Sequence, residues 1–176
     1  MVTVSDDVRE RILSYVKHQV AKGPDGIRDA IQKGHEQLLG SIDGLSEEQA
    51  TFKSAPDDWN VLEVLRHVQE SKRSIARRCV ALAGGETPAA IGAIGTIAQE
   101  PFSSLADARS ALDSGHQELL AFVGTVSSET DVEATYPHPW FGPLNGLEWA
   151  AFQRVHDGDH ASQIDQIRAA PAFPAA

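Results

Sequence analysis

The sequence predicts an all-α protein, a bundle of amphipathic helices. Apolar residues recur every three or four positions along most of the chain, which is the period of a helix with one buried face. No segment shows the sustained alternation of apolar and polar residues that is typical of a half-buried strand. The 176 residues suit a single domain, which can bury a core without disulfides.

The chain begins with a short helix and continues with four longer ones. Residues 5–21 form the first helix, within an N-terminal extension over 1–22, and the run Lys22-Gly23-Pro24-Asp25-Gly26 breaks it. Ser46-Glu47-Glu48-Gln49 has the pattern of a short capped turn. The longer helices are expected over 26–43, 59–82, 103–125 and 144–169.

Two longer loops separate the later helices. Residues 84–102 contain Gly and Pro without a clear period. The second loop, 127–143, holds an aromatic run from Tyr136 to Pro143 and contains no predicted strand. This loop could cover a binding site or cap the core. Residues 171–176 are expected to form a flexible tail.

Charge and cysteine content exclude several classes of function. The formal net charge of −10 repels phosphate backbones and anionic lipid, so we expect neither a nucleic-acid partner nor a membrane partner. Cys79 is the single cysteine and lies in an apolar helical pattern, which is typical of a small core residue. The N-terminus has no apolar signal segment, so we expect a cytoplasmic protein. The partner that we expect is a small-molecule substrate.

Part of the sequence is similar to a later part of itself. Ala30–Glu48 aligns without gaps to Ala111–Glu129, and seven of nineteen positions are identical. Within this alignment Gly34-His35 matches Gly115-His116. A duplicated helical hairpin would give a bundle with a pseudo-two-fold axis. Chance similarity between two amphipathic helices is the alternative.

Two histidines on the last helix are candidates for metal ligation. His156 and His160 are four residues apart and share a helix face with Trp149 and Phe152. Imidazoles in an apolar stripe must be hydrogen-bonded or coordinated. A zincin helix, with the pattern His-Glu-x-x-His, is the competing motif. It fits less well, because Asp157 replaces the glutamate and no later histidine supplies a third ligand.

The other histidines divide into groups by position. His67 lies on the flank of its helix, where it could face a helix seam or solvent. His35 and His116 are more central to their stripes, and we favour core histidines hydrogen-bonded across the bundle over metal ligands. His18 is expected at the surface, and His138 either lines a pocket mouth or packs within its loop.

Several motifs together resemble the DinB/YfiT-like superfamily. The segment from Trp59 to His67 resembles that family's second-helix signature. The approach to the last helix is similar as well, and the resemblance spans about residues 26–170. Its residues are His138-Pro139-Trp140-Phe141-Gly142-Pro143-Leu144, then Glu148-Trp149, then His156-x-x-x-His160-x-x-Gln163-Ile164.

The resemblance implies an up-down-down-up four-helix bundle with a long crossover, often dimeric. It also implies one divalent metal ion held by His67, His156 and His160. Three imidazoles suit Zn, Ni, Fe or Mn without choosing among them. This sequence departs from the family pattern in having Asp157-Gly158-Asp159 between the last two ligands, where glycine lowers helix stability by about 1 kcal/mol relative to alanine.

The family includes thiol-dependent S-transferases and isomerases and proteins described as metal-dependent hydrolases. We therefore carry three hypotheses: an enzyme that activates a low-molecular-weight thiol, a hydrolase that activates water, and a stress-associated metal-binding bundle without catalysis. Glu63, Asp157 and Asp159 are candidates for orienting the imidazoles or for proton transfer, although each could simply be a solvated carboxylate. The basic candidates for a thiol pocket are Arg66, Arg73, Arg77, Arg78 and Arg154.

Overall fold

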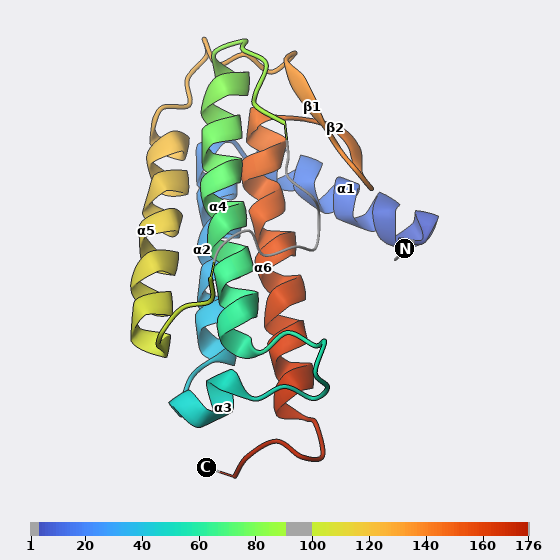
Figure 1. Ribbon diagram of the computed structural model, residues 1–176. Helices are drawn as coiled ribbons and strands as arrows, with labels where there is room; N and C mark the ends of the chain where they lie inside the picture. Colours follow the sequence, from blue (N-terminus) through green and yellow to red (C-terminus); the bar gives the residue numbers. More distant parts are fainter. Residues whose placement is uncertain (1–3, 91–99, 176) are drawn as a thin grey trace.

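Four long helices lie side by side in the computed structural model, which describes residues 4–90 and 100–175 (Figure 1). The predicted all-α four-helix bundle is confirmed. A helix precedes the bundle, and a short helix and a hairpin lie in its connections. The bounds are α1 Asp6–Ala21, α2 Pro24–Ser41, α3 Glu47–Thr51, α4 Val61–Ala83, α5 Leu105–Gly124, β1 Thr135–His138, β2 Gly142–Asn145 and α6 Gly146–Arg168.

The helices have the up-down-down-up order that the family resemblance implies. In Figure 1, α2 and α6 run downward while α4 and α5 run upward. Because α4 and α5 are parallel, α5 begins at the end of the bundle where α4 begins. Around the bundle, α2 packs against α6 and α5, and α4 packs against the same two helices. The two apolar clusters of the core fill the space between these four helices.

The helix starts follow from local sequence. Gly23 has a φ of 75°, which favours glycine, and Pro24 occupies the first turn of α2. The helix therefore starts two residues earlier than predicted, and Gly26 lies inside it rather than in a break. The predicted capped turn is present as α3, where Ser46 and Gln49 form a capping box.

A two-stranded hairpin occupies part of the loop over 127–143, where the sequence predicted no strand. Its strands pair antiparallel, with Thr135 opposite Asn145 and Pro137 opposite Pro143. Proline cannot donate a ladder hydrogen bond, so two prolines facing each other mask the strand pattern. The hairpin fits the sequence only because its strands are short and both belong to an exposed edge.

The two halves of the bundle repeat the same construction. Asn60 and Glu63 form a capping box at the start of α4, and Asn145 and Glu148 form one at the start of α6. Both helices have 23 residues. The glycines of the internal repeat also have equivalent places. Gly34 lies against Asp157 of α6, and Gly115 lies against Lys72 of α4; an added Cβ would lie only 3.1 Å and 3.2 Å from these side chains, which would have to shift. These contacts support the duplicated hairpin over chance similarity.

Peripheral segments also pack on the bundle. Val16 of α1 is buried in the core. Two residues of the tail, whose flexibility stays a prediction, contact the bundle: the Phe173 ring lies 5.4 Å from Phe52, and the Gln49 amide donates to the carbonyl of Pro174 at 2.9 Å. Cys79 is buried as expected, and burial raises the pKa of its thiol. None of the helices described is both long and apolar enough to cross a membrane.

Candidate metal centre

Three histidines meet at the seam between α4 and α6. His67 comes from α4 and His156 and His160 from α6, and one ring nitrogen of each lies within 4.8 Å of the others. The ring centroid of His67 is 5.3 Å from that of His156 and 4.8 Å from that of His160. Within the described residues this is the one cluster of histidine, cysteine and carboxylate side chains able to hold a metal ion. His67 therefore faces the helix seam rather than solvent.

The environment of His156 favours the neutral imidazole. Burial lowers the pKa of His156 well below its ordinary value, and His160 and His67 lower it further. Its Nδ1 is buried and has no hydrogen-bond partner among the described residues. A neutral imidazole is the form that coordinates a cation, and a buried nitrogen without a partner is otherwise unfavourable.

Gln163 orients the third ring. The Oε1 of Gln163 lies 2.8 Å from Nδ1 of His160, one turn later on α6. The amide oxygen can only accept, so Nδ1 carries the proton and Nε2 of His160 is left for coordination. The sequence motif contained Gln163, but periodicity alone gave it no role. Its spacing of three from a candidate ligand was the available signal.

The donor set fits a divalent cation. Three imidazole nitrogens that could approach to about 2.1 Å from a common centre are typical of sites for Zn²⁺ and similar ions. Trp59 packs beside this cluster, with its ring 5.2 Å from His67. The described chain adds no carboxylate to the three histidines.

A model of the DinB superfamily matches residues 30–164. The chain belongs to the DinB superfamily. The match includes all three clustered histidines, and the family resemblance drawn from their motifs is confirmed.

Two individual proteins extend this comparison. The DinB-superfamily protein is 24% identical over 149 residues to the uncharacterized protein YuaE of Bacillus subtilis (strain 168), covering 72% of this chain and 88% of YuaE. It also resembles the crystal structure of TT2238, described as a four-helix bundle protein, with a TM-score of 0.61 and 22% identity. That likeness covers 81% of this chain and 98% of TT2238, and it shows the fold.

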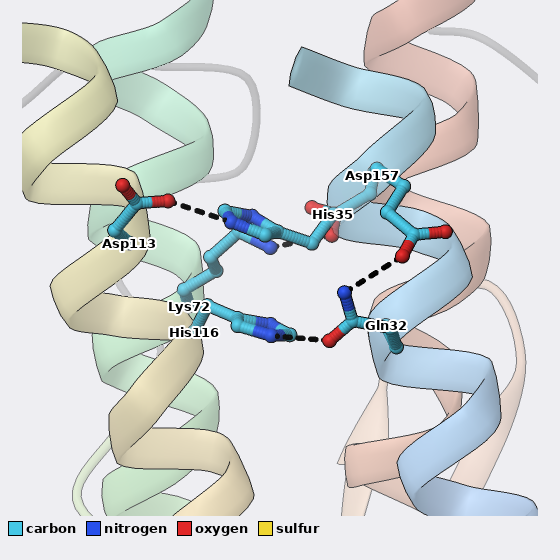
Figure 2. Close-up of polar contacts among 7 residues, drawn as sticks. Gln32, His35, Lys72, Asp113, His116 and Asp157 are labelled. Atoms are coloured by element: carbon cyan, nitrogen blue, oxygen red, sulfur yellow. Dashed lines mark hydrogen bonds and ion pairs between the residues drawn. The ribbon is translucent and has the colours of Figure 1, made fainter. Parts of the chain in front are cut away.

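A polar layer crosses the bundle beside the metal cluster. Figure 2 shows the rings of His35 and His116 lying parallel between α2 and α5, with centroids 4.1 Å apart. Asp113 accepts from Nε2 of His35 at 2.8 Å, and Gln32 pairs with Nε2 of His116 at 2.9 Å. The favoured interpretation of these histidines, core residues hydrogen-bonded across the bundle, is confirmed.

A fully buried ion pair completes this layer. Lys72 of α4 and Asp157 of α6 are both 0% exposed and bonded to each other (Figure 2). Gln153 donates to the other oxygen of Asp157 at 2.7 Å. Although it follows His156 in sequence, Asp157 therefore points into the core. It does not orient the ligand imidazoles, as the sequence had suggested it could.

The two carboxylates named as catalytic candidates lie apart from this layer. Glu63 accepts from the backbone N–H of Asn60 at 2.7 Å and pairs with Lys53 at 2.9 Å, so its carboxylate caps α4. Asp159 is exposed on α6. Glu70, which the sequence did not single out, follows His67 by three residues and so lies on the same side of α4.

His138 is the last residue of β1, next to the turn of the hairpin, and its ring packs on α6. Its ring is 4.7 Å from Phe152 and 5.2 Å from Trp149, both on the α6 stripe that continues to His156. Burial, followed by the charge of Arg78, lowers the pKa of His138 to about 4. His138 also packs within its own loop, against Phe141 and Trp140, which is one of the two roles that the sequence predicted. Trp140 at the hairpin tip is 42% exposed, whereas Phe141 is buried at 5%.

Proposed function

We propose that this DinB-superfamily protein is an enzyme that holds one divalent metal ion with His67, His156 and His160. The observation that carries the proposal is the convergence of three imidazole nitrogens, all within 4.8 Å of one another, from two adjacent helices. When bound, an ion with three neutral ligands keeps its charge and open positions, so it lowers the pKa of a thiol or water that reaches it.

The chain's own residues favour a thiol over water as the nucleophile. A hydrolase needs a carboxylate in reach of the attacking water. Asp157 is paired with Lys72 in the core, Glu63 is held by Asn60 and Lys53, and Asp159 is exposed. Glu70, three residues after His67, is the base that the hydrolytic alternative would use. A small thiol brings its own nucleophile and needs mainly a pocket with polar anchors. We infer a thiol-dependent transfer to a small electrophile, with hydrolysis as the alternative.

Metal binding is tested first, by titrating Zn²⁺, Ni²⁺, Mn²⁺ and Fe²⁺ into chelator-treated protein in a calorimeter. We expect one ion per chain, and a loss of at least about tenfold in affinity for His156→Ala, because three ligands hold the ion. His18→Ala, on the exposed face of α1, is the matched control. Equal affinity of the His156→Ala and wild-type proteins would exclude this site.

The reaction is tested on the loaded protein. Cysteine or glutathione is supplied with 1-chloro-2,4-dinitrobenzene, and p-nitrophenyl acetate is supplied without thiol. We expect metal-dependent turnover only where a thiol is present. Turnover of the ester alone would favour the hydrolase, and metal binding without turnover of either would favour the non-catalytic bundle.

A further inference from the structure

Arg78 of α4 is a buried cation whose charge is not balanced by the described part of the chain. Its side chain is 4% exposed. Its Nη2 makes one long hydrogen bond of 3.5 Å to Ser74, and its buried Nε has no acceptor among the described residues. Buried charges are normally paired and fully hydrogen-bonded, so this guanidinium can take a further partner.

Other arginines of the protein differ from Arg78 in having acidic partners. Arg28, Arg73 and Arg109 lie 2.6–3.4 Å from a carboxylate, and the side chain of each is more than a third exposed. Around Arg78, by contrast, burial is the main influence and lowers the pKa of the guanidinium, and the neighbouring groups that act on it are Cys79 and Tyr136. The least solvated of these cations is thus the one without an anion.

Aromatic rings cover the guanidinium but give its buried Nε–H no acceptor. The central carbon of the Arg78 guanidinium lies 4.5 Å from the centroid of Trp149 and 5.2 Å from that of Tyr136. Rings stabilise the cation through their faces and do not accept in-plane hydrogen bonds from its edge. The indole N–H of Trp149 is itself engaged, by the carbonyl of Tyr136 at 3.2 Å.

His138 supplies a second donor in the same region. The backbone N–H of Trp140 donates to Nδ1 of His138 at 3.2 Å, so in the neutral ring Nε2 carries the proton. Arg78 is close enough for its charge to disfavour protonation of His138. Both groups pack on Trp149, with the guanidinium carbon of Arg78 4.5 Å and the ring centroid of His138 5.2 Å from the Trp149 centroid, so the two donors lie near each other between α4 and the β1–β2 hairpin.

This region is connected to the metal centre along α6. His138 packs on Trp149 and Phe152, and Phe152 precedes His156 by about one turn. Trp149 and His156 are seven residues apart, which corresponds to about 10 Å along a helix. A molecule anchored at Arg78 would therefore have to extend about 10 Å along α6 to reach His156.

We propose that Arg78 and His138 bind the carboxylate of a small organic acid beneath the hairpin, with the rest of the molecule directed along α6 toward the histidine cluster. The direction toward the cluster rests on the proposed function, whereas the carboxylate site does not. One guanidinium neutralises one negative charge and matches two carboxylate oxygens. The aromatic walls and the net charge of −10 disfavour a strongly hydrated dianion such as phosphate.

Trp149 reports on this site directly. In a Trp59→Phe/Trp140→Phe background its fluorescence is measured while benzoate or the neutral benzamide is added. We expect benzoate to bind at least about tenfold more tightly than benzamide, since only benzoate carries the charge that pairs with Arg78. Equal binding of the two compounds, or no binding of either, would overturn the proposal.

Variants locate the charge that matters. Arg78→Gln is expected to lose at least about tenfold in benzoate affinity, and Arg78→Lys to lose less. The control is Arg77→Gln, which removes the same charge from the adjacent exposed position and should leave affinity unchanged. Circular dichroism checks folding. If Arg78→Gln does not fold, the test rests on the benzoate affinity of Arg78→Lys and on the comparison of benzoate with benzamide in the parent protein. Unchanged benzoate affinity in a folded Arg78→Gln protein would contradict the site.

The titrations are run on chelator-treated and metal-loaded protein. Benzoate binding in both states, with no metal binding, would remove the proposed function and leave the carboxylate site standing. Metal binding with no preference for benzoate over benzamide would remove the carboxylate site and leave the proposed metal site standing.

Discussion

At the scale of single residues, Phe141 and Trp140 have opposite roles although they are neighbours in one loop. Phe141 is buried against Phe152, while Trp140 is 42% exposed. We expect Phe141→Ala to lower the free energy of unfolding by about 3–5 kcal/mol, as for a large core truncation. Trp140→Ala should cost less than about 1 kcal/mol, since surface changes cost little. Urea denaturation compares the two, and equal losses would show that Trp140 also caps the core.

His116 makes a prediction about acid stability. Burial, followed by His35 and Lys72, lowers the pKa of His116 to about 4, and Asp157 and Asp113 only partly oppose this. An unfolded histidine titrates near about 6.5, so the unfolded chain takes up a proton in a range where the native ring stays neutral. The contribution of His116 is therefore present above about pH 6.5 and lost as the pH falls toward 4.

The matched variant is His116→Gln, which keeps a polar side chain but cannot titrate. Relative to this variant, we expect the wild type to lose up to about 3 kcal/mol of stability between pH 6.5 and pH 4. Guanidinium denaturation at a series of pH values measures the difference. Parallel pH profiles for the two proteins would show that His116 is not held neutral.

At the scale of helices, the Lys72–Asp157 pair joins α4 to α6, the two helices that carry the metal ligands. Asp157→Asn leaves the Lys72 charge buried without a counter-ion, so we expect a loss of about 3–5 kcal/mol in the free energy of unfolding. The double variant Lys72→Met/Asp157→Leu removes both charges and should recover most of that loss. Denaturation curves of the three proteins test this, and a double variant no more stable than Asp157→Asn would contradict it.

Sequence patterns predicted the helices better than they predicted this ion pair. Long amphipathic stretches and capping residues such as Ser46 fix the helices locally, so periodicity reveals them. The partner of a buried charge depends on packing between distant segments. Asp157 and Lys72 are 85 residues apart, and nothing local distinguishes Asp157 from the exposed Asp159. The hairpin escaped prediction for a related reason, because only pairing makes Pro137 and Pro143 part of a strand.

The candidate site shows the same division. His156 and His160 could be paired from their spacing because they share one helix. The position of His67 on a helical wheel did not decide whether it faces a helix seam or solvent. Only the family resemblance linked His67 to His156 and His160. Arg78 gave no sequence signal that separates it from Arg77, since burial of its guanidinium depends on Tyr136 and Trp149 from the other half of the chain.

At the scale of the whole molecule, the repeated halves carry opposite charges at one equivalent position. Lys72 lies twelve residues after its helix cap Asn60, and Asp157 lies twelve residues after its cap Asn145 (72 − 60 = 157 − 145). Equivalent positions thus carry opposite charges, and they meet at the centre of the bundle. A self-pairing of either half would bury two like charges there, which is strongly unfavourable.

The bundle should therefore behave as a split protein with obligate partners. We expect the fragments 1–90 and 100–176, produced separately, to assemble one to one into a helical complex, while neither forms a homodimer. Sedimentation and circular dichroism measure this, and Lys72→Met in the first fragment is the control that should permit self-association. A stable homodimer of the unaltered first fragment would contradict it. In an ancestral assembly of two identical hairpins, this pair of charges would have converted a self-recognising half into one that accepts only its counterpart.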